Sequence, residues 1–240
     1  MTLKQASCTQ STLSTPCPRL RVVAVVLAAG TATRMGGRPK SLLLREGQTL
    51  LARLLQQLAQ AGIDQTILVL GHHAQLIQQA LQHSSPDLSG PKNRPSMQLL
   101  TVMNPAPEAG QNSSLHLGLA AAQALSPEWL MVALADQPLL EAADFKDLIA
   151  AVKQAPSGTQ MLQPSVNGQP GNPVLLSRHV MESILENPLW GGKEWRQHHP
   201  EQVLAWPSTN THYRIDMDTP EDIAKLSEEY GIELTWGQTH

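Results

Sequence analysis

An unbroken apolar run from Val22 to Ala29 leads directly into a short glycine-rich loop that ends at Lys40. Such a run is typical of a strand buried on both faces of a parallel sheet. Ligands of these sheets bind beyond the carboxyl ends of the strands, so we expect the loop to face a ligand. Its glycines let backbone N–H groups approach closely, and Arg34 and Lys40 add two positive charges. The sequence therefore predicts an anion-binding site at this sheet edge.

Segments of strand and helix character alternate along the rest of the chain. Leucines recur at helical spacing in residues 49–61, and residues 63–70 form a second apolar run that ends at Gly71. This alternation predicts an α/β fold with a doubly wound, mostly parallel sheet and helices on both faces, which makes three layers. The other predicted strands are 97–103, 129–135, 160–164, 173–177, 202–206 and 213–215, and the other predicted helices are 72–83, 113–125, 141–153, 178–186 and 219–230.

The length of 240 residues and the composition fit one globular domain. Apolar residues make up 41%, and the net charge of −3 argues against a nucleic-acid binder that works through bulk charge. Both cysteines, Cys8 and Cys17, lie in a Ser/Thr/Pro-rich stretch. We therefore expect residues 1–20 to be a disordered tail and 21–240 a single domain. No apolar run is long enough for a membrane span, so we expect a cytoplasmic protein without membrane or nucleic-acid partners.

Two common phosphate-binding patterns do not fit the loop. A P-loop has the form G-x-x-x-x-G-K-[ST], whereas Gly36 is followed here by a second glycine and Pro39 precedes the lysine. A dinucleotide-binding loop has the form G-x-G-x-x-G, whereas Ala32 and Met35 occupy its second and third glycine positions. Neither an NTPase of the P-loop type nor a dehydrogenase is supported.

The loop instead has the form L-A-A-G-x-x-x-R-M-G-…-P-K, from Leu27 to Lys40. This resembles the signature of the MobA-like NTP transferase family, which joins NTP to a phosphorylated acceptor and releases pyrophosphate. The likeness is closest to the molybdenum cofactor cytidylyltransferases and implies a Rossmann-like nucleotidyltransferase fold. It also implies that Arg34 and Lys40 hold the triphosphate. Fixed cations at this place offset the charge that develops on the leaving pyrophosphate.

Three aspartates that follow predicted strands are candidates for a Mg²⁺ site. Mg²⁺ typically takes one or two carboxylates together with phosphate oxygens. Residues 134–138 and 216–222 resemble the family motifs L-A-D-x-P, whose aspartate binds the metal, and D-x-D-T-P-E-D. Asp216 and Asp218 point the same way on an extended segment, so either could complete the site. The predicted catalytic residues are Arg34, Lys40 and Asp136, and the predicted metal ligands are Asp136, Asp216 and Asp218.

A serine-containing loop, Gly110–Leu115, precedes a predicted helix and resembles the nucleotide-contacting G-x-S-S-S-L loop of the family. Ser113 or Ser114 would also cap that helix, which accounts for one of them without a ligand. Ala29 matches the L-A-A-G form associated with CTP users, whereas guanylyltransferases usually carry L-A-G-G, so CTP is favoured over GTP. The residues that the resemblance assigns to the nucleotide are Leu27, Ala28, Ala29, Gly30, Arg34, Gly36, Lys40, Gly110, Ser113 and Ser114.

The acceptor end matches the family less closely. Asn172 stands where the family motif G-H-P-V has histidine, and Lys193 stands where G-D-x-G-A-R has arginine. Lysine keeps the charge but loses the bidentate fork that suits a phosphate. Four tryptophans after residue 180 line an acceptor pocket or form a C-terminal satellite core, and we favour the core.

These features predict a Mg²⁺-dependent nucleotidyltransferase in which an acceptor phosphate attacks the α-phosphorus of an NTP. CMP transfer from CTP to the molybdenum cofactor is the favoured reaction, and molybdoenzymes or their maturation factors are the implied protein partners. One alternative keeps the chemistry and changes the substrates: a guanylyltransferase for the same cofactor, or a transferase acting on a sugar or alditol phosphate. The other alternative is a non-catalytic accessory protein that binds a nucleotide or a cofactor.

Overall fold

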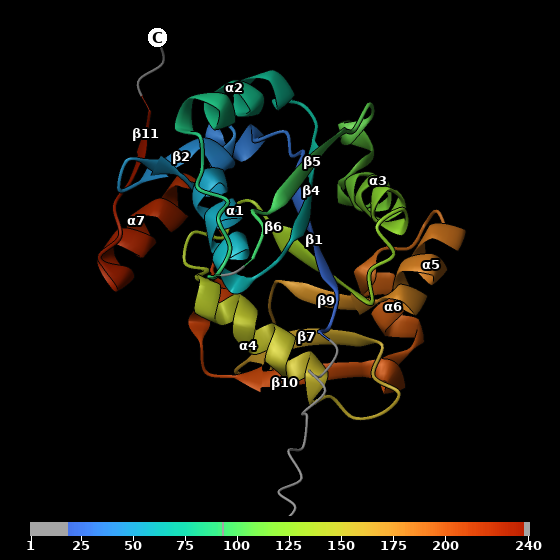
Figure 1. Cartoon of the computed structure of the whole chain (residues 1–240). Helices are drawn as coiled ribbons and strands as arrows, with labels where there is room; N and C mark the ends of the chain where they lie inside the picture. Colours follow the sequence, from blue (N-terminus) through green and yellow to red (C-terminus); the bar gives the residue numbers. More distant parts are fainter. Residues whose placement is uncertain (1–18, 93, 238–240) are drawn as a thin grey trace, which may run out of the picture.

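The computed structural model describes residues 19–92 and 94–237, and it contains a mostly parallel sheet with helices on both faces (Figure 1). The strands of the sheet are β1 (Val22–Ala28), β4 (Gln65–Leu70), β5 (Gln98–Met103), β6 (Trp129–Leu134), β7 (Met161–Val166), β8 (Gln169–Pro170), β9 (Val174–Ser177) and β10 (Val203–Ser208). Their order is β10-β7-β9-β6-β1-β4-β5, with β8 paired to β7. Among the described strands of this sheet, only β8 and β9 run antiparallel to their neighbours. The predicted doubly wound α/β class is thereby confirmed.

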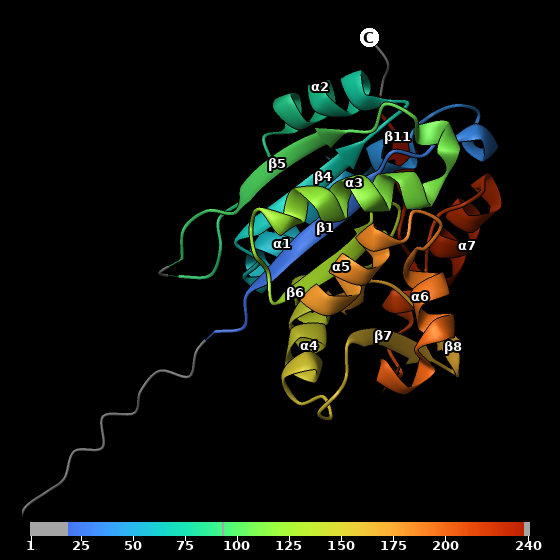
Figure 2. The same ribbon diagram turned by 90° about the vertical axis from the view of Figure 1, so that its right-hand side faces the viewer.

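Helices cover the sheet in two layers (Figure 2). The helices are α1 (Leu50–Ala61), α2 (Ala74–Ser84) and α4 (Ala142–Lys153) on one face, and α3 (Gln111–Gln123), α5 (Arg178–Glu186) and α6 (Gly192–His198) on the other. Successive side chains of a strand point to opposite faces, so β1 contributes Ala24 and Val26 to the first layer and Val23, Val25 and Leu27 to the second. This explains why β1 is apolar at every position.

Local sequence signals set the ends of several elements. The Thr49 side chain accepts a hydrogen bond from the Ala52 N–H (3.2 Å), and Gly62 ends α1 with a left-handed φ of 88°. Asn167 and Gly168 both have positive φ and form the turn between β7 and β8. Each of these caps and turns depends on residues that are close together in the sequence.

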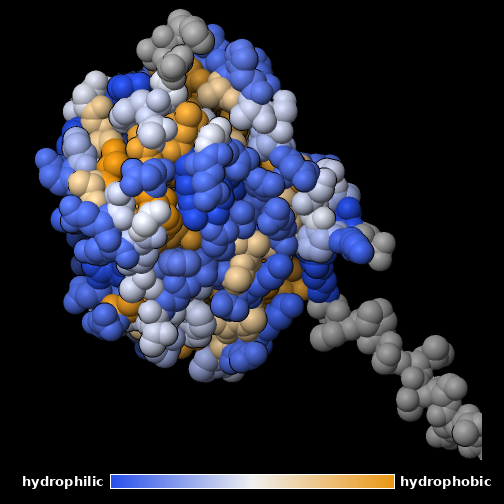
Figure 3. All heavy atoms as spheres, turned by 90° about the vertical axis from the view of Figure 1, so that its left-hand side faces the viewer, coloured by the Kyte–Doolittle hydropathy of each residue, from blue (hydrophilic) through white to orange (hydrophobic). Residues whose placement is uncertain are grey.

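A second, three-stranded sheet lies beside the main one, in the order β11 (Leu234–Trp236), β2 (Leu43–Arg45), β3 (Gln48–Thr49). Together with α7 (Pro220–Tyr230) it encloses a third hydrophobic cluster. Met35 and Met217 are both buried in this cluster, so it ties the loop after β1 to the segment that carries Asp216 and Asp218. Figure 3 shows the face with α7 and α2, where hydrophobic side chains are visible in several places among mostly hydrophilic ones.

Some predictions from the sequence pattern are wrong. Residues 213–215 were predicted as a strand, but Tyr213 and Arg214 belong to a 3-10 helix (Thr211–Arg214) and Ile215 follows it. The Asn210 side chain caps this helix, and the Tyr213 hydroxyl donates to the Asp144 carbonyl. The late tryptophans do not form one satellite core. Trp195 is fully buried among the helices α3, α5 and α6, and Trp190 packs there too, whereas Trp206 packs against the opposite layer and Trp236 against the third cluster.

The predicted N-terminal tail lies largely outside the described residues, and both cysteines lie there too. The last two residues of that stretch are described: Arg19 pairs with Asp64 (2.6 Å), and Leu20 packs against the core. Within residues 19–92 and 94–237, none of the helices is long and apolar enough to cross a membrane.

Candidate active site

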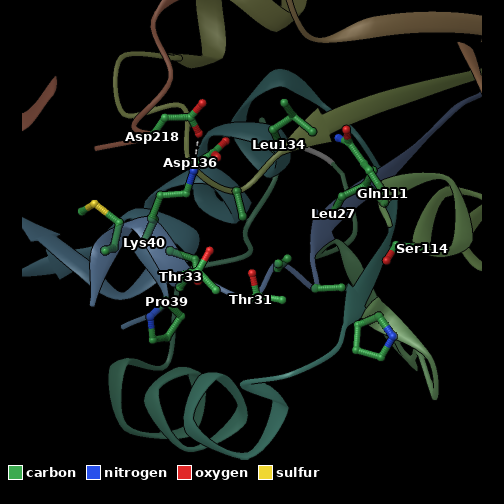
Figure 4. A pocket seen from close by; sticks show the side chains of 18 of the residues that line it. Leu27, Thr31, Thr33, Pro39, Lys40, Gln111, Ser114, Leu134, Asp136 and Asp218 are labelled. Carbon is green, nitrogen blue, oxygen red and sulfur yellow. Dashed lines mark hydrogen bonds and ion pairs between the residues drawn. The ribbon is translucent and has the colours of Figure 1, made fainter. Parts of the chain in front are cut away.

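A cavity of about 570 Å³ opens at the carboxyl ends of β1 and β6 (Figure 4). Its wall comes from four separate stretches: the loop after β1, the loop between β5 and α3, the end of β6, and the segment before α7. Two predicted site residues, Gly36 and Ser113, do not line it. The predicted site residues that do line it are Leu27, Ala28, Ala29, Gly30, Arg34, Lys40, Gly110, Ser114, Asp136, Asp216 and Asp218.

The loop after β1 is shaped by its backbone. Ala32 has a φ of 55°, and its carbonyl accepts hydrogen bonds from Met35 N–H (2.9 Å) and Gly37 N–H (3.0 Å). Met35 is buried in the third cluster and also borders the cavity, next to Thr33 and Arg34 on the same wall. Gly36 has a φ of 64°, a conformation that favours glycine. Gly36 therefore ends this turn instead of lining the cavity.

Lys40 lies between two carboxylates at one end of the cavity. Its Nζ is 2.7 Å from Asp136 Oδ2 and 2.8 Å from Asp218 Oδ1. Arg34 Nη1 lies 3.5 Å from the other oxygen of Asp218. Burial alone would lower the pKa of Lys40, but Asp136 and Asp218 outweigh it and raise that pKa above its usual value. The lysine is therefore charged at neutral pH.

Asp216 completes a group of three carboxylates at this end of the cavity. Burial, together with the negative charges of Asp136 and Asp218, raises the pKa of Asp216. Three acids facing two cations leave an excess of negative charge at this end of the cavity. A further cation would reduce the repulsion among the three carboxylates.

The donor set fits a hard divalent cation that draws further ligands from a substrate. In the part of the chain that the structure describes, no group of three or more His, Cys, Asp or Glu side chains is placed to hold a metal ion. Asp136 Oδ1 is nevertheless buried and has no hydrogen-bond partner among the described residues. A cation bound to Asp136 and to either of the other aspartates would complete its shell with water and phosphate oxygens, as Mg²⁺ does.

The loop between β5 and α3 is organised by a buried asparagine. Asn104 Nδ2 donates to the hydroxyls of both Ser113 and Ser114 (2.9 Å each), and its Oδ1 accepts from Ala106 N–H (2.9 Å). The prediction that a serine caps α3 is wrong: the helix begins at Gln111, two residues earlier, and no side chain caps it. Ser114 therefore reaches the cavity from within the first helical turn.

Gly71, at the end of β4, allows two cavity loops to meet. A Cβ at this position would lie 2.7 Å from the Ala29 carbonyl oxygen and 2.8 Å from the Cβ atoms of Ala29 and Pro107. The sequence marked Gly71 only as a strand end. Sequence reasoning did not identify five further residues that line the cavity: Thr31, Thr33, Ser41, Glu108 and Gln111. Only their position in or next to the loops already singled out could have indicated them.

The two residues singled out at the acceptor end do not line the cavity. Asn172 lies close to the edge of the cavity. Its carbonyl accepts a hydrogen bond from the side chain of Gln137 (3.3 Å), the residue that follows Asp136. Lys193 is exposed on α6.

Comparisons with known proteins point to one family. The model of the MobA-like NTP transferase domain matches residues 24–203. The molybdenum cofactor guanylyltransferase of Rhodopseudomonas palustris is 26% identical over 209 residues, which cover 84% of this chain and 90% of that protein. The bifunctional IPC transferase and DIPP synthase of Thermococcus kodakarensis is 35% identical over 95 residues, 39% of this chain, and the match spans only 19% of that protein.

Solved structures confirm the predicted fold. The crystal structure of Rv0371c from Mycobacterium tuberculosis has a TM-score of 0.65 and 27% identity, and the match covers 89% of this chain and 100% of that one. The same mycobacterial protein has also been solved in complex with manganese, at a TM-score of 0.61 and 26% identity. The 4-diphosphocytidyl-2C-methyl-D-erythritol synthase of Anaerococcus prevotii and a CMP:2-keto-3-deoxy-manno-octonic acid synthetase, only 14% and 12% identical, match this fold with TM-scores of 0.66 and 0.64.

Proposed function

The chain belongs to the MobA-like NTP transferase family, and from this premise we propose that it transfers CMP from CTP to the phosphate of a molybdenum-cofactor-type acceptor. A phosphate oxygen of the acceptor attacks the α-phosphorus of the nucleotide. The bond from that phosphorus to the oxygen bridging to the β-phosphorus breaks, and pyrophosphate leaves with the electron pair. No covalent intermediate with the protein is required.

The cations and the aspartates of the cavity have roles in this reaction. Arg34 and Lys40 neutralise the β- and γ-phosphates, and they stabilise the charge that grows on the leaving group. Asp136, with Asp218 or Asp216, would hold Mg²⁺, which would supply further charge neutralisation when bound. The protein otherwise acts by holding the two substrates in line.

The observation that carries the proposal is the separation of the cavity into two ends. Lys40, Asp136 and Asp218 gather at one end, whereas Leu27, Gln111 and Ser114 lie at the other (Figure 4). A nucleoside triphosphate has the same division into a charged chain and a flat, largely uncharged base. The cavity volume of about 570 Å³ also lies within the usual range for small-molecule sites.

The choice of CTP rests on Ala29, which is buried at the cavity wall in the L-A-A-G form of the loop. GTP is the second candidate, because the relative from Rhodopseudomonas palustris is a guanylyltransferase. A single methyl group at the base pocket discriminates by only about 1–3 kcal/mol. Sugar or alditol phosphates are the alternative acceptors for the same chemistry.

Pyrophosphate release tests the proposal. The purified protein is incubated with Mg²⁺ and each of the four NTPs, with and without a molybdopterin-type acceptor. The expected result is release that needs both CTP and the acceptor. Release with GTP alone among the nucleotides would reassign the base, and cofactor delivery by Asp136→Ala without any pyrophosphate release would support the accessory-protein alternative instead.

A further inference from the structure

The Lys40 ammonium is held by carboxylates from two distant parts of the chain. Asp136 follows β6, and Asp218 precedes α7, yet each places an oxygen within 2.8 Å of Lys40 Nζ (Figure 4). These are the distances of charge-assisted hydrogen bonds, which are stronger than bonds between neutral groups. The Lys40 side chain is 19% exposed, so water screens these contacts only in part. Lys40 is thus the cation that bridges the two carboxylates in this structure.

A divalent cation that bridged Asp136 Oδ2 and Asp218 Oδ1 would need the place that Nζ takes, and one bound to Asp136 Oδ1 would share a carboxylate with the ammonium and be repelled by it. The ammonium and a metal ion are both small cations, and both prefer carboxylate oxygens. They cannot bind the same pair of oxygen atoms at once without close contact between like charges. Arg34 differs, because it is 72% exposed and lies 3.5 Å from only the outer oxygen of Asp218.

We propose that the Lys40 ammonium competes with the divalent cation for Asp136 and Asp218. The inference rests on the proposed function, since it concerns the metal that this function requires. In the free protein Lys40 keeps divalent cations weakly bound. When a triphosphate enters, its oxygens offer Lys40 another partner, and the two carboxylates become available. Cation and nucleotide therefore bind cooperatively, and the coupling is the same in whichever order they arrive.

The test measures Mn²⁺ binding to the nucleotide-free protein, by electron paramagnetic resonance of the unbound ion. Lys40→Met keeps a side chain of similar length without the charge, and we expect it to bind Mn²⁺ about tenfold or more tightly than the wild type. Arg34→Met is the matched control, because it removes an exposed cation from the same site. We expect it to change the affinity by less than about threefold, since exposed charges are screened by solvent. Adding Asp136→Asn to Lys40→Met should abolish the gain.

A second measurement uses the wild-type protein and does not depend on how well a variant folds. Acetic anhydride labels free amines, and peptide mass spectrometry reports the extent of labelling at Lys40. Saturating Mn²⁺ should increase labelling of Lys40 while leaving the exposed Lys193 unchanged.

The inference is overturned if Lys40→Met and wild type bind Mn²⁺ equally, if Arg34→Met gains as much as Lys40→Met, or if Mn²⁺ leaves Lys40 labelling unchanged. These outcomes are separable from the proposed function. If the wild type releases pyrophosphate but shows no Lys40 effect, only the competition by Lys40 is refuted. If the Lys40 effect is present but transfer activity is absent, only the proposed function is refuted.

Discussion

Gly71→Ala adds one methyl group at the point where two cavity loops meet. The new Cβ would lie 2.7 Å from the Ala29 carbonyl oxygen and 2.8 Å from the Cβ of Pro107. Optimal contacts between carbon atoms lie near about 3.5–4.0 Å, so each neighbour must withdraw by about 1 Å. Neither can rotate away, because one is a backbone atom and the other belongs to a proline ring. We expect overpacking of this kind to reduce the free energy of unfolding by about 1–3 kcal/mol.

The same displacement reaches the cavity, because Ala29 and Pro107 both line it. A shift of about 1 Å in groups that position a substrate can reduce a rate about a hundredfold. We expect Gly71→Ala to lower kcat/KM by about ten- to a hundredfold and to lower the Tm by about 2–4 °C for each kcal/mol lost. Calorimetry and the pyrophosphate assay measure the two effects.

Gly30→Ala is the matched control for stability, because a Cβ there would meet nothing within 4 Å. Its Tm should stay close to that of the wild type. Equal Tm values for Gly71→Ala and Gly30→Ala would refute the packing argument at Gly71. A normal kcat/KM in a destabilised Gly71→Ala protein would refute only the link from packing to the cavity.

Three further substitutions test other parts of the account. Thr49→Ala removes the hydroxyl that caps α1 and should lower the free energy of unfolding in urea by about 0.5–2 kcal/mol; an unchanged midpoint contradicts the cap. Burial alone would raise the pKa of Asp222, but hydrogen bonds from the Thr219 and Asp218 N–H groups outweigh it and keep that pKa below its usual value. The stabilisation by Asp222 is therefore complete above the pKa that this carboxyl has in the unfolded chain, and it is lost as the pH falls through the lower pKa of the folded protein. The difference in free energy of unfolding between wild type and Asp222→Asn should thus become smaller in acid. A difference that stays constant from neutral pH down to strong acid contradicts this. Asp136→Asn should lower kcat/KM about a hundredfold or more with the fold retained by circular dichroism, and near-normal turnover would remove Asp136 from the site.

The fold could be predicted from the sequence because its signals are local. The apolar run of β1, the cap at Thr49 and the left-handed Gly62 each depend on residues within one element or next to it. The strand predicted at 213–215 failed because its conformation depends on Asp144, which lies far away in the sequence and accepts the Tyr213 hydroxyl. No periodicity within the segment could reveal that contact.

The cavity was predictable only in part, for a related reason. The motifs predicted that Arg34, Lys40, Asp136 and Asp218 lie at one edge of the sheet. The contacts of Lys40 with both aspartates depend in addition on the third hydrophobic cluster, which buries Met35 and Met217. Motif matching also treated Gly36 as part of the wall, whereas it supplies a turn with positive φ. A motif states which residues recur; it does not separate those that bind from those that shape the backbone.

Transfer of the α-phosphoryl group tests the central claim most directly. The protein is incubated with Mg²⁺, the molybdopterin-type acceptor and CTP labelled at either the α- or the γ-phosphate, and the products are separated. The account predicts that the α-label moves to the acceptor while the γ-label leaves as pyrophosphate, one for each acceptor consumed. Label that stays in intact nucleotide, or a γ-label released as inorganic phosphate with no labelled acceptor, would contradict it.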